Sequence, residues 1–148
     1  MSITAASMSH LLTLTQERNF YQMQQIYWSN EHTAIEAQVT QYSKLESKWQ
    51  KAYEDIMDAS TSKKITFNGV TYDGENNTCN AQIAEAYASS MVQEYDEETL
   101  LELSNLEVEY ESMQQMYETL LEETNARIEQ QKELVSENAK DTGLLNAG

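Results

Sequence analysis

The sequence predicts a mainly α-helical fold: a long antiparallel helical hairpin, or coiled coil, with a small β-hairpin insertion and a short helix. The first observation is a ladder of large apolar residues at every seventh position: Leu14, Tyr21, Trp28, Ile35, Tyr42, Trp49 and Ile56. A period of seven keeps one stripe on one side of a supercoiled helix. The second is a scarcity of helix breakers, because the 148 residues include 4 glycines and 0 prolines. The third is one strong turn signal, Asn68-Gly69, which is typical of a β-hairpin.

The first helix is expected over residues 3–59 and would be roughly 85 Å long if continuous, at about 1.5 Å per residue. A helix of that length needs contacts along its whole course. Its second coiled-coil position is often polar, at Glu17, Gln24, Glu31 and Gln38. This favours a helix that touches different neighbours along its length over a simple two-stranded zipper.

A β-hairpin is expected over residues 64–73. Asn68-Gly69 supplies the two positive-φ residues of a type I′ turn, and the flanking residues alternate between apolar and polar. The register predicts three facing pairs: Ile65 with Tyr72, Thr66 with Thr71, and Phe67 with Val70. Two strands alone are marginally stable in water, so we expect the apolar face to pack on a helix or on a neighbouring subunit.

A short helix over residues 79–94, for which Asn77 or Thr78 is a candidate cap, precedes a last helix over residues 97–139. Asp96 is placed to cap or bend the chain between them. The apolar residues of the last helix alternate steps of three and four, which predicts core positions for Leu103, Leu106, Tyr110, Met113, Tyr117 and Leu120. Beyond these residues the phase is expected to drift by one, to Leu121, Ile128 and Val135. A tail over residues 140–148 completes a single elongated domain, 1–148.

Charge is distributed unevenly along the chain. The net charge of −16 argues against binding to nucleic acid, and no apolar run reaches the ~20 residues of a membrane span. Residues 94–129 carry twelve acidic residues against Arg127 alone. Folding the last helix back along the first would bring its acidic start, Glu94 to Glu111, beside five lysines, which favours this register of the helical hairpin. They are Lys44, Lys48, Lys51, Lys63 and Lys64.

No motif in the sequence predicts an enzyme. A Walker loop, a dinucleotide-binding glycine motif and a zinc-binding His-Glu-x-x-His are absent. His32 and Glu36 stand one turn apart and could share a metal, but a solvated histidine is the commoner meaning of such a pair. The single cysteine, Cys79, permits no internal disulfide. We therefore expect no catalytic, cofactor or metal site.

The ladder divides into two parts with different expected roles. Its later part, Tyr42, Trp49 and Ile56, is expected to form a core within the chain together with the last helix. The earlier part has little charge, so we expect contacts between subunits there and at two leucines of the tail: Leu14, Tyr21, Trp28, Ile35, Leu144 and Leu145. The expected function is that of a non-enzymatic structural subunit that self-assembles into a filament, a tube or another multimer. The alternative is a coiled-coil binding module, such as a secretion chaperone or adaptor, for a basic or helical protein partner.

Two resemblances bear on this expectation. The start Ala6-Ser7-Met8-Ser9-His10-Leu11-Leu12-Thr13-Leu14-Thr15, the Tyr/Gln-rich helix after it and the acidic last helix resemble a group of uncharacterised gut-bacterial proteins. In architecture, the chain is similar to type III-exported filament proteins of the flagellin, needle and translocon-filament kind. This second resemblance implies a filament core of paired terminal helices and a secretion apparatus as a partner. The start lacks the features of a Sec signal peptide, which leaves export by a Sec-independent route or a cytoplasmic location.

Overall fold

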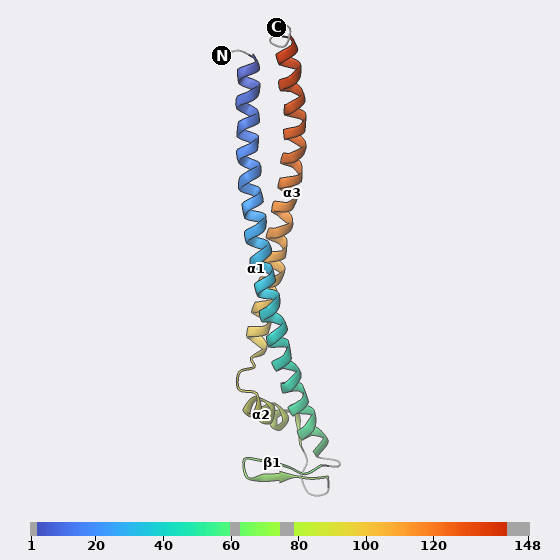
Figure 1. Ribbon diagram of the computed structural model, residues 1–148. Coiled ribbons are helices and arrows are strands. Elements are labelled where there is room, and N and C mark those ends of the chain that lie inside the picture. Colours follow the sequence, from blue (N-terminus) through green and yellow to red (C-terminus); the bar gives the residue numbers. More distant parts are fainter. Residues whose placement is uncertain (1–2, 60–62, 75–78, 142–148) are drawn as a thin grey trace. The chain divides into compact units, whose positions relative to one another are not determined.

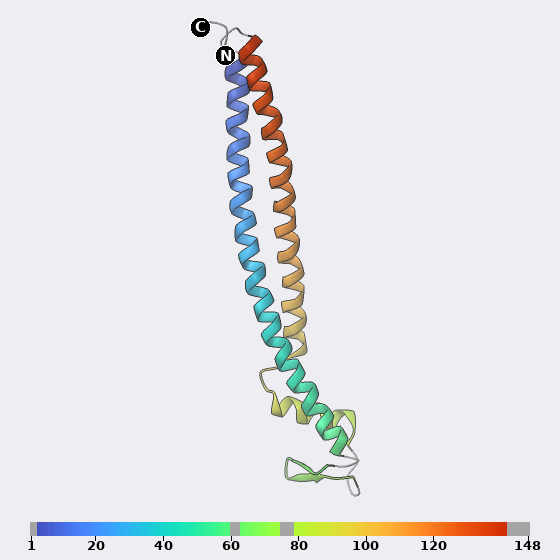
Figure 2. The ribbon, with the colours of Figure 1, turned by 45° about the vertical axis from the view of Figure 1, so that its right-hand side comes forward.

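The protein is mainly α-helical with one small β-hairpin, as expected. A computed structural model describes residues 3–59, 63–74 and 79–141 (Figures 1 and 2). Its elements are α1 (Ile3–Ala59), β1 (Ile65–Phe67), β2 (Val70–Tyr72), α2 (Ala81–Met91) and α3 (Glu97–Asp141). The tail from residue 142, with Leu144 and Leu145, lies outside the described residues.

The helices begin where side chains can cap them. Asn80 caps α2, because its side-chain oxygen accepts a hydrogen bond from the Ile83 amide at 3.0 Å. The candidate caps Asn77 and Thr78 lie outside the described residues, and α2 is shorter at both ends than the expected 79–94. Asp96 directly precedes α3, and its carboxylate accepts a hydrogen bond from the Thr99 hydroxyl at 3.1 Å.

The chain comprises two compact units: residues 1–33 with 108–148 (unit 1), and residues 34–107 (unit 2). The expectation of a single elongated domain stays a prediction. In unit 1 the first part of α1 and the last part of α3 lie side by side in both views (Figures 1 and 2). Trp28 packs on Tyr110 with ring centroids 5.4 Å apart, and Tyr21 packs on Tyr117 at 6.2 Å. Tyr21 comes before Trp28 in α1, whereas its partner Tyr117 comes after Tyr110 in α3, so the two helices are antiparallel.

The seam of unit 1 continues through polar residues, which we did not predict. Thr4, Ser7, Thr124 and Gln131 are all buried. The side-chain amide of Gln131 donates to the Ser7 carbonyl at 2.9 Å, and that of Asn138 donates to the Ser7 hydroxyl. A buried polar group is tolerated when it is hydrogen-bonded, so these residues can occupy seam positions that an apolar pattern does not reveal.

The burial pattern of α3 agrees with the expected phase drift. Met113 and Leu120 are half-buried, but the next residues of that row, Arg127 and Leu134, are exposed, and Leu121, Ile128 and Val135 are half-buried or buried instead. One heptad position runs unbroken through Tyr110, Tyr117, Thr124, Gln131 and Asn138, each of them buried or half-buried. The second position of the same heptad includes Leu121, Ile128 and Val135. The row of Tyr110 therefore continues along α3, whereas the second row moves by one residue, from Leu120 to Leu121.

Unit 2 is built around a core of Ile56, Ala84 and Tyr87. The strands pair in the expected register, Ile65 with Tyr72, Thr66 with Thr71, and Phe67 with Val70. Asn68 and Gly69 have φ of 51° and 75°, which the turn requires. The apolar side chains of Ile65, Phe67 and Tyr72 pack against the helical core, as expected, and Phe67 meets the Tyr87 ring edge-on at 5.3 Å.

Candidate interaction surface

Most of the ladder residues that we expected at a subunit interface are used inside the chain. Leu14 and Ile35 are only 4% and 5% exposed. Tyr21 and Trp28 are half-buried, because α3 presents Tyr117 and Tyr110 to them. These seam residues therefore leave little apolar surface for a second subunit.

The residues expected in the intramolecular core are buried or half-buried in their own units. They are Tyr42, Trp49, Ile56, Leu103 and Leu106 in unit 2, and Tyr110, Met113, Tyr117 and Leu120 in unit 1. Tyr42 joins the connector between α2 and α3 to α1: its hydroxyl donates to the Glu94 carbonyl at 3.0 Å and accepts from the Asp96 amide at 2.7 Å. Trp49 Nε1 donates to the Ser89 hydroxyl at 3.3 Å, so two of these residues also bond to the segment that follows the hairpin.

Two groups of unit 2 have raised pKa values. Burial is the main cause of the raised pKa of Tyr95, whose ring lies 5.8 Å from those of Tyr42 and Trp49, and the negative charges of Glu46 and Glu97 raise it further. Burial also raises the pKa of the Cys79 thiol, which packs against the core. A raised pKa lowers the fraction of reactive thiolate, so this environment suits a structural cysteine.

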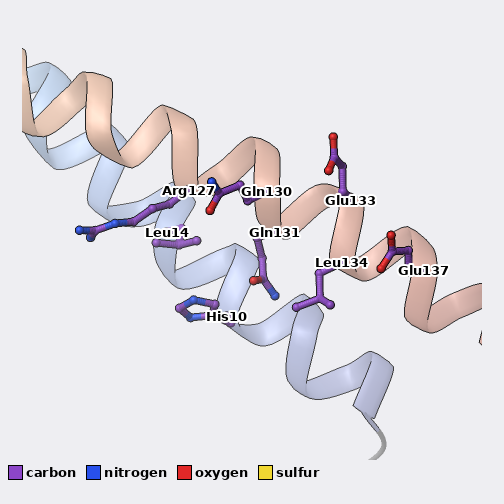
Figure 3. Close-up of a pocket in the computed structure, with 8 residues that line it drawn as sticks. All are labelled: His10, Leu14, Arg127, Gln130, Gln131, Glu133, Leu134 and Glu137. Atoms are coloured by element: carbon purple, nitrogen blue, oxygen red, sulfur yellow. The ribbon is translucent and has the colours of Figure 1, made fainter.

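The open groove near the start of α1 offers hydrogen-bonding groups but no hydroxyl or thiol nucleophile. It has a volume of about 380 Å³ and is lined by His10, Leu14, Arg127, Gln130, Gln131, Glu133, Leu134 and Glu137 (Figure 3). Gln131 and Leu134 point toward α1, whereas Glu133 points away from it (Figure 3). Lys44, Lys48 and Lys51, which we expected beside the acidic start of the last helix, are exposed in unit 2, and the Lys63 ammonium pairs with Asp55 of α1 at 3.8 Å.

A different surface of unit 1 lacks charge altogether. We call it the outer face of α1, and it is formed by Ala5, Ala6, Ser9, Leu12, Thr13, Gln16, Asn19, Phe20, Met23, Ile26, Tyr27, Asn30 and Thr33. Every one of these residues is exposed, and they occupy the three heptad positions farthest from the ladder row. Phe20 lies at the edge of this face, because its ring also meets Tyr117 of α3 edge-on with centroids 6.5 Å apart. A solvent-facing helix surface normally carries charged residues, and none is present here.

Large apolar side chains are concentrated in the middle of the outer face of α1. Phe20, Met23, Ile26 and Tyr27 are each between 52% and 69% exposed. Side chains of this size expose together roughly 400 Å² of apolar surface, which lies in the range of the largest patches on monomeric proteins, and such patches are often functional. The sequence contains one sign of this patch, which is the lack of charged residues at the outer positions of α1. These positions can be identified only when the seam is known.

The corresponding outer face of α3 has the opposite character. In unit 1 it comprises Val108, Glu109, Ser112, Gln115, Met116, Thr119, Glu122, Glu123, Ala126, Glu129, Gln130, Glu133, Ser136, Glu137 and Lys140, all exposed. Six glutamates and one lysine make it strongly acidic. Lys132 partly balances it, since its ammonium lies 3.4 Å from Glu129. The two helices of unit 1 thus offer two chemically distinct surfaces.

No protein-family model, curated protein or solved structure matches this chain. Among the described residues, 3–59, 63–74 and 79–141, no helix combines the length and the apolar character that a bilayer crossing requires. The exposed surfaces of unit 1 are therefore the features that bear on function.

Proposed function

We propose that the protein is a non-enzymatic structural subunit that self-assembles through helix packing into a filament, a tube or another multimer. The observation that carries this proposal is the outer face of α1, which is exposed, uncharged and rich in large apolar residues. Burying roughly 400 Å² of apolar surface at about 25 cal/mol per Å² favours association by up to about 10 kcal/mol before the costs of binding. Packing this face against a helix of another subunit removes its apolar surface from water and so lowers the free energy.

The acidic outer face of α3 supports the same proposal in a second way. Glutamates at the outer positions keep that helix hydrated and repel other acidic surfaces. Subunits can then associate through α1 but not through α3, so the charges select which surface forms the contact. Export of the subunit is part of the proposal, since the architecture is similar to that of type III-exported filament proteins.

Light scattering on two matched variants tests the proposal. Met23→Glu places a carboxylate in the outer face of α1, and Met116→Glu places the same group on the acidic outer face of α3. We expect the unaltered chain and Met116→Glu to form multimers, visible also by negative-stain microscopy, and Met23→Glu to raise the dissociation constant at least tenfold. A chain that stays monomeric over a wide concentration range would refute self-assembly, and equal effects of the two variants would show that the outer face of α1 is not the contact.

The second candidate function is a binding module for a basic or helical protein partner, such as a secretion chaperone or adaptor. The observation that favours it is the outer face of α3, with six glutamates against one lysine. Such binding should weaken steeply with salt, because the Debye length falls from about 10 Å at 0.1 M to about 3 Å at 1 M. A pull-down with a lysine-rich helical peptide at low and high salt tests it, and Glu122→Gln with Glu129→Gln should reduce the retained peptide.

A further inference from the structure

We infer that the outer face of α1 binds the same face of a second copy in an antiparallel contact whose two-fold axis passes by Met23. This inference rests on the proposed self-assembly and adds its geometry. In a two-fold contact one surface must be complementary to itself, so that residue i meets residue j and residue j meets residue i. The outer face of α1 has this property.

The order of residue types along the outer face reads nearly the same from either side of Met23. Three residues before Met23 lies Phe20, and three residues after it lies Ile26, both large, apolar and exposed. Seven residues to each side are Gln16 and Asn30, which both carry amides, and ten residues to each side are Thr13 and Thr33. When two such helices run antiparallel about Met23, Phe20 meets Ile26, Gln16 meets Asn30 and Thr13 meets Thr33, whereas the Asn19 amide meets the Tyr27 ring with its hydroxyl.

Charge makes a second copy the best occupant of this face. A basic or acidic partner would find no counter-charge there, since no residue of the outer face is charged. The outer face lies opposite the seam, so two copies joined through it keep their acidic α3 helices on the far sides of the contact.

The surface beside Ile26 has room for a partner side chain. A hollow of about 320 Å³ lies there, lined by Gln25, Ile26, Ser29 and Asn30. In the antiparallel pairing, Phe20 of the partner subunit comes to Ile26 and can enter this hollow, and the symmetric contact repeats on the other copy. With roughly 400 Å² of apolar surface from each copy, the contact falls below the ~800 Å² per partner of a standard interface, so the pairing should depend on concentration.

Short-range cross-linking of cysteine variants tests the geometry. In a Cys79→Ser background, we compare Met23→Cys, Asn30→Cys, an equal mixture of Gln16→Cys and Asn30→Cys chains, and Ser112→Cys on the outer face of α3. In the antiparallel pair the two residues at position 23 meet, whereas the two at position 30 lie roughly 21 Å apart along the axis at about 1.5 Å per residue. A bis-maleimide with a span below that separation distinguishes the two cases.

We expect efficient dimer cross-linking for Met23→Cys and for the Gln16→Cys and Asn30→Cys mixture, and at least fivefold less for Asn30→Cys alone and for Ser112→Cys. Strong cross-linking of Asn30→Cys alone would indicate a parallel pair and overturn the inference. Multimers in light scattering without cross-links at any α1 position would overturn it while leaving the proposed function intact. Monomers for every variant and for the unaltered chain would refute the function as well.

Discussion

The clearest test of the two roles of α1 compares Ile56→Ala with Ile26→Ala. The two substitutions remove the same three carbons from the same helix. Ile56 is fully buried in the core of unit 2, whereas Ile26 is 55% exposed on the outer face of unit 1. One variant should therefore affect folding, and the other should affect association.

The expected magnitudes follow from burial. At about 0.8 kcal/mol per buried methylene, Ile56→Ala loses about 2.4 kcal/mol of transfer free energy, and the cavity brings the total to about 3 kcal/mol. In a chain of this size that loss lowers Tm by roughly 6–12 °C. Ile26→Ala loses less than half of the transfer term, and alanine's higher helix propensity offsets part of that, so the free energy of unfolding should change by under about 0.5 kcal/mol.

Urea denaturation followed by tryptophan fluorescence measures the first effect. In a Trp28→Phe background, Trp49 is the remaining tryptophan and reports on unit 2. The titration is run at a concentration at which light scattering finds monomers, so that association does not contribute. Light scattering at higher concentration then measures association, which Ile26→Ala should weaken and Ile56→Ala should not. An equal loss of stability in both variants, or weaker association for Ile56→Ala alone, would refute the assignment of α1 to two roles.

Two further predictions concern the connector before α3. Tyr42→Phe removes the hydroxyl that bonds to Glu94 and Asp96, so it should cost about 1–2 kcal/mol of unfolding free energy and speed hydrogen exchange at the Asp96 amide. The contact between the ring at position 42 and the tilted Tyr95 ring should persist. Because the pKa of Tyr95 is raised, the folded chain keeps the proton of the Tyr95 hydroxyl at a pH at which the unfolded chain has lost it. The stability that this difference contributes is complete below about pH 10 and is lost as the pH rises further. Glu46→Gln removes one cause of the shift and should make this alkaline loss smaller in urea titrations, and an unchanged or larger loss would contradict the assignment.

Much of the fold could be predicted from local signals. The period of seven predicted the long first helix, and its bounds, residues 3–59, agree with α1. Asn68-Gly69 specified the turn so strongly that the register of the β-hairpin followed residue by residue. The expected bounds of α2, residues 79–94, were wrong at both ends: we missed the local cap by Asn80, which accepts from the Ile83 amide, and the helix ends before the buried Val92.

The candidate surface was harder to predict than the fold. A ladder of Leu14, Tyr21 and Trp28 is compatible with contacts to α3 or to another subunit, and only the partner rings on α3 decide between them. The polar seam residues Ser7 and Gln131 were missed because burial of a polar side chain depends on a hydrogen bond to a residue far away in the chain.

The sequence by itself determined the helical class, the hairpin turn, the acidic last helix and the lack of a known catalytic motif, because each is encoded by residues within a few turns of one another. The tertiary structure decided which side of α1 faces α3. That choice sets the seven-residue ladder inside the chain and leaves Phe20, Met23, Ile26 and Tyr27 outside. The physical reason is that the exposed face of α1 is the face left uncovered when another face packs against α3. In the sequence, α3 lies far from the start of α1.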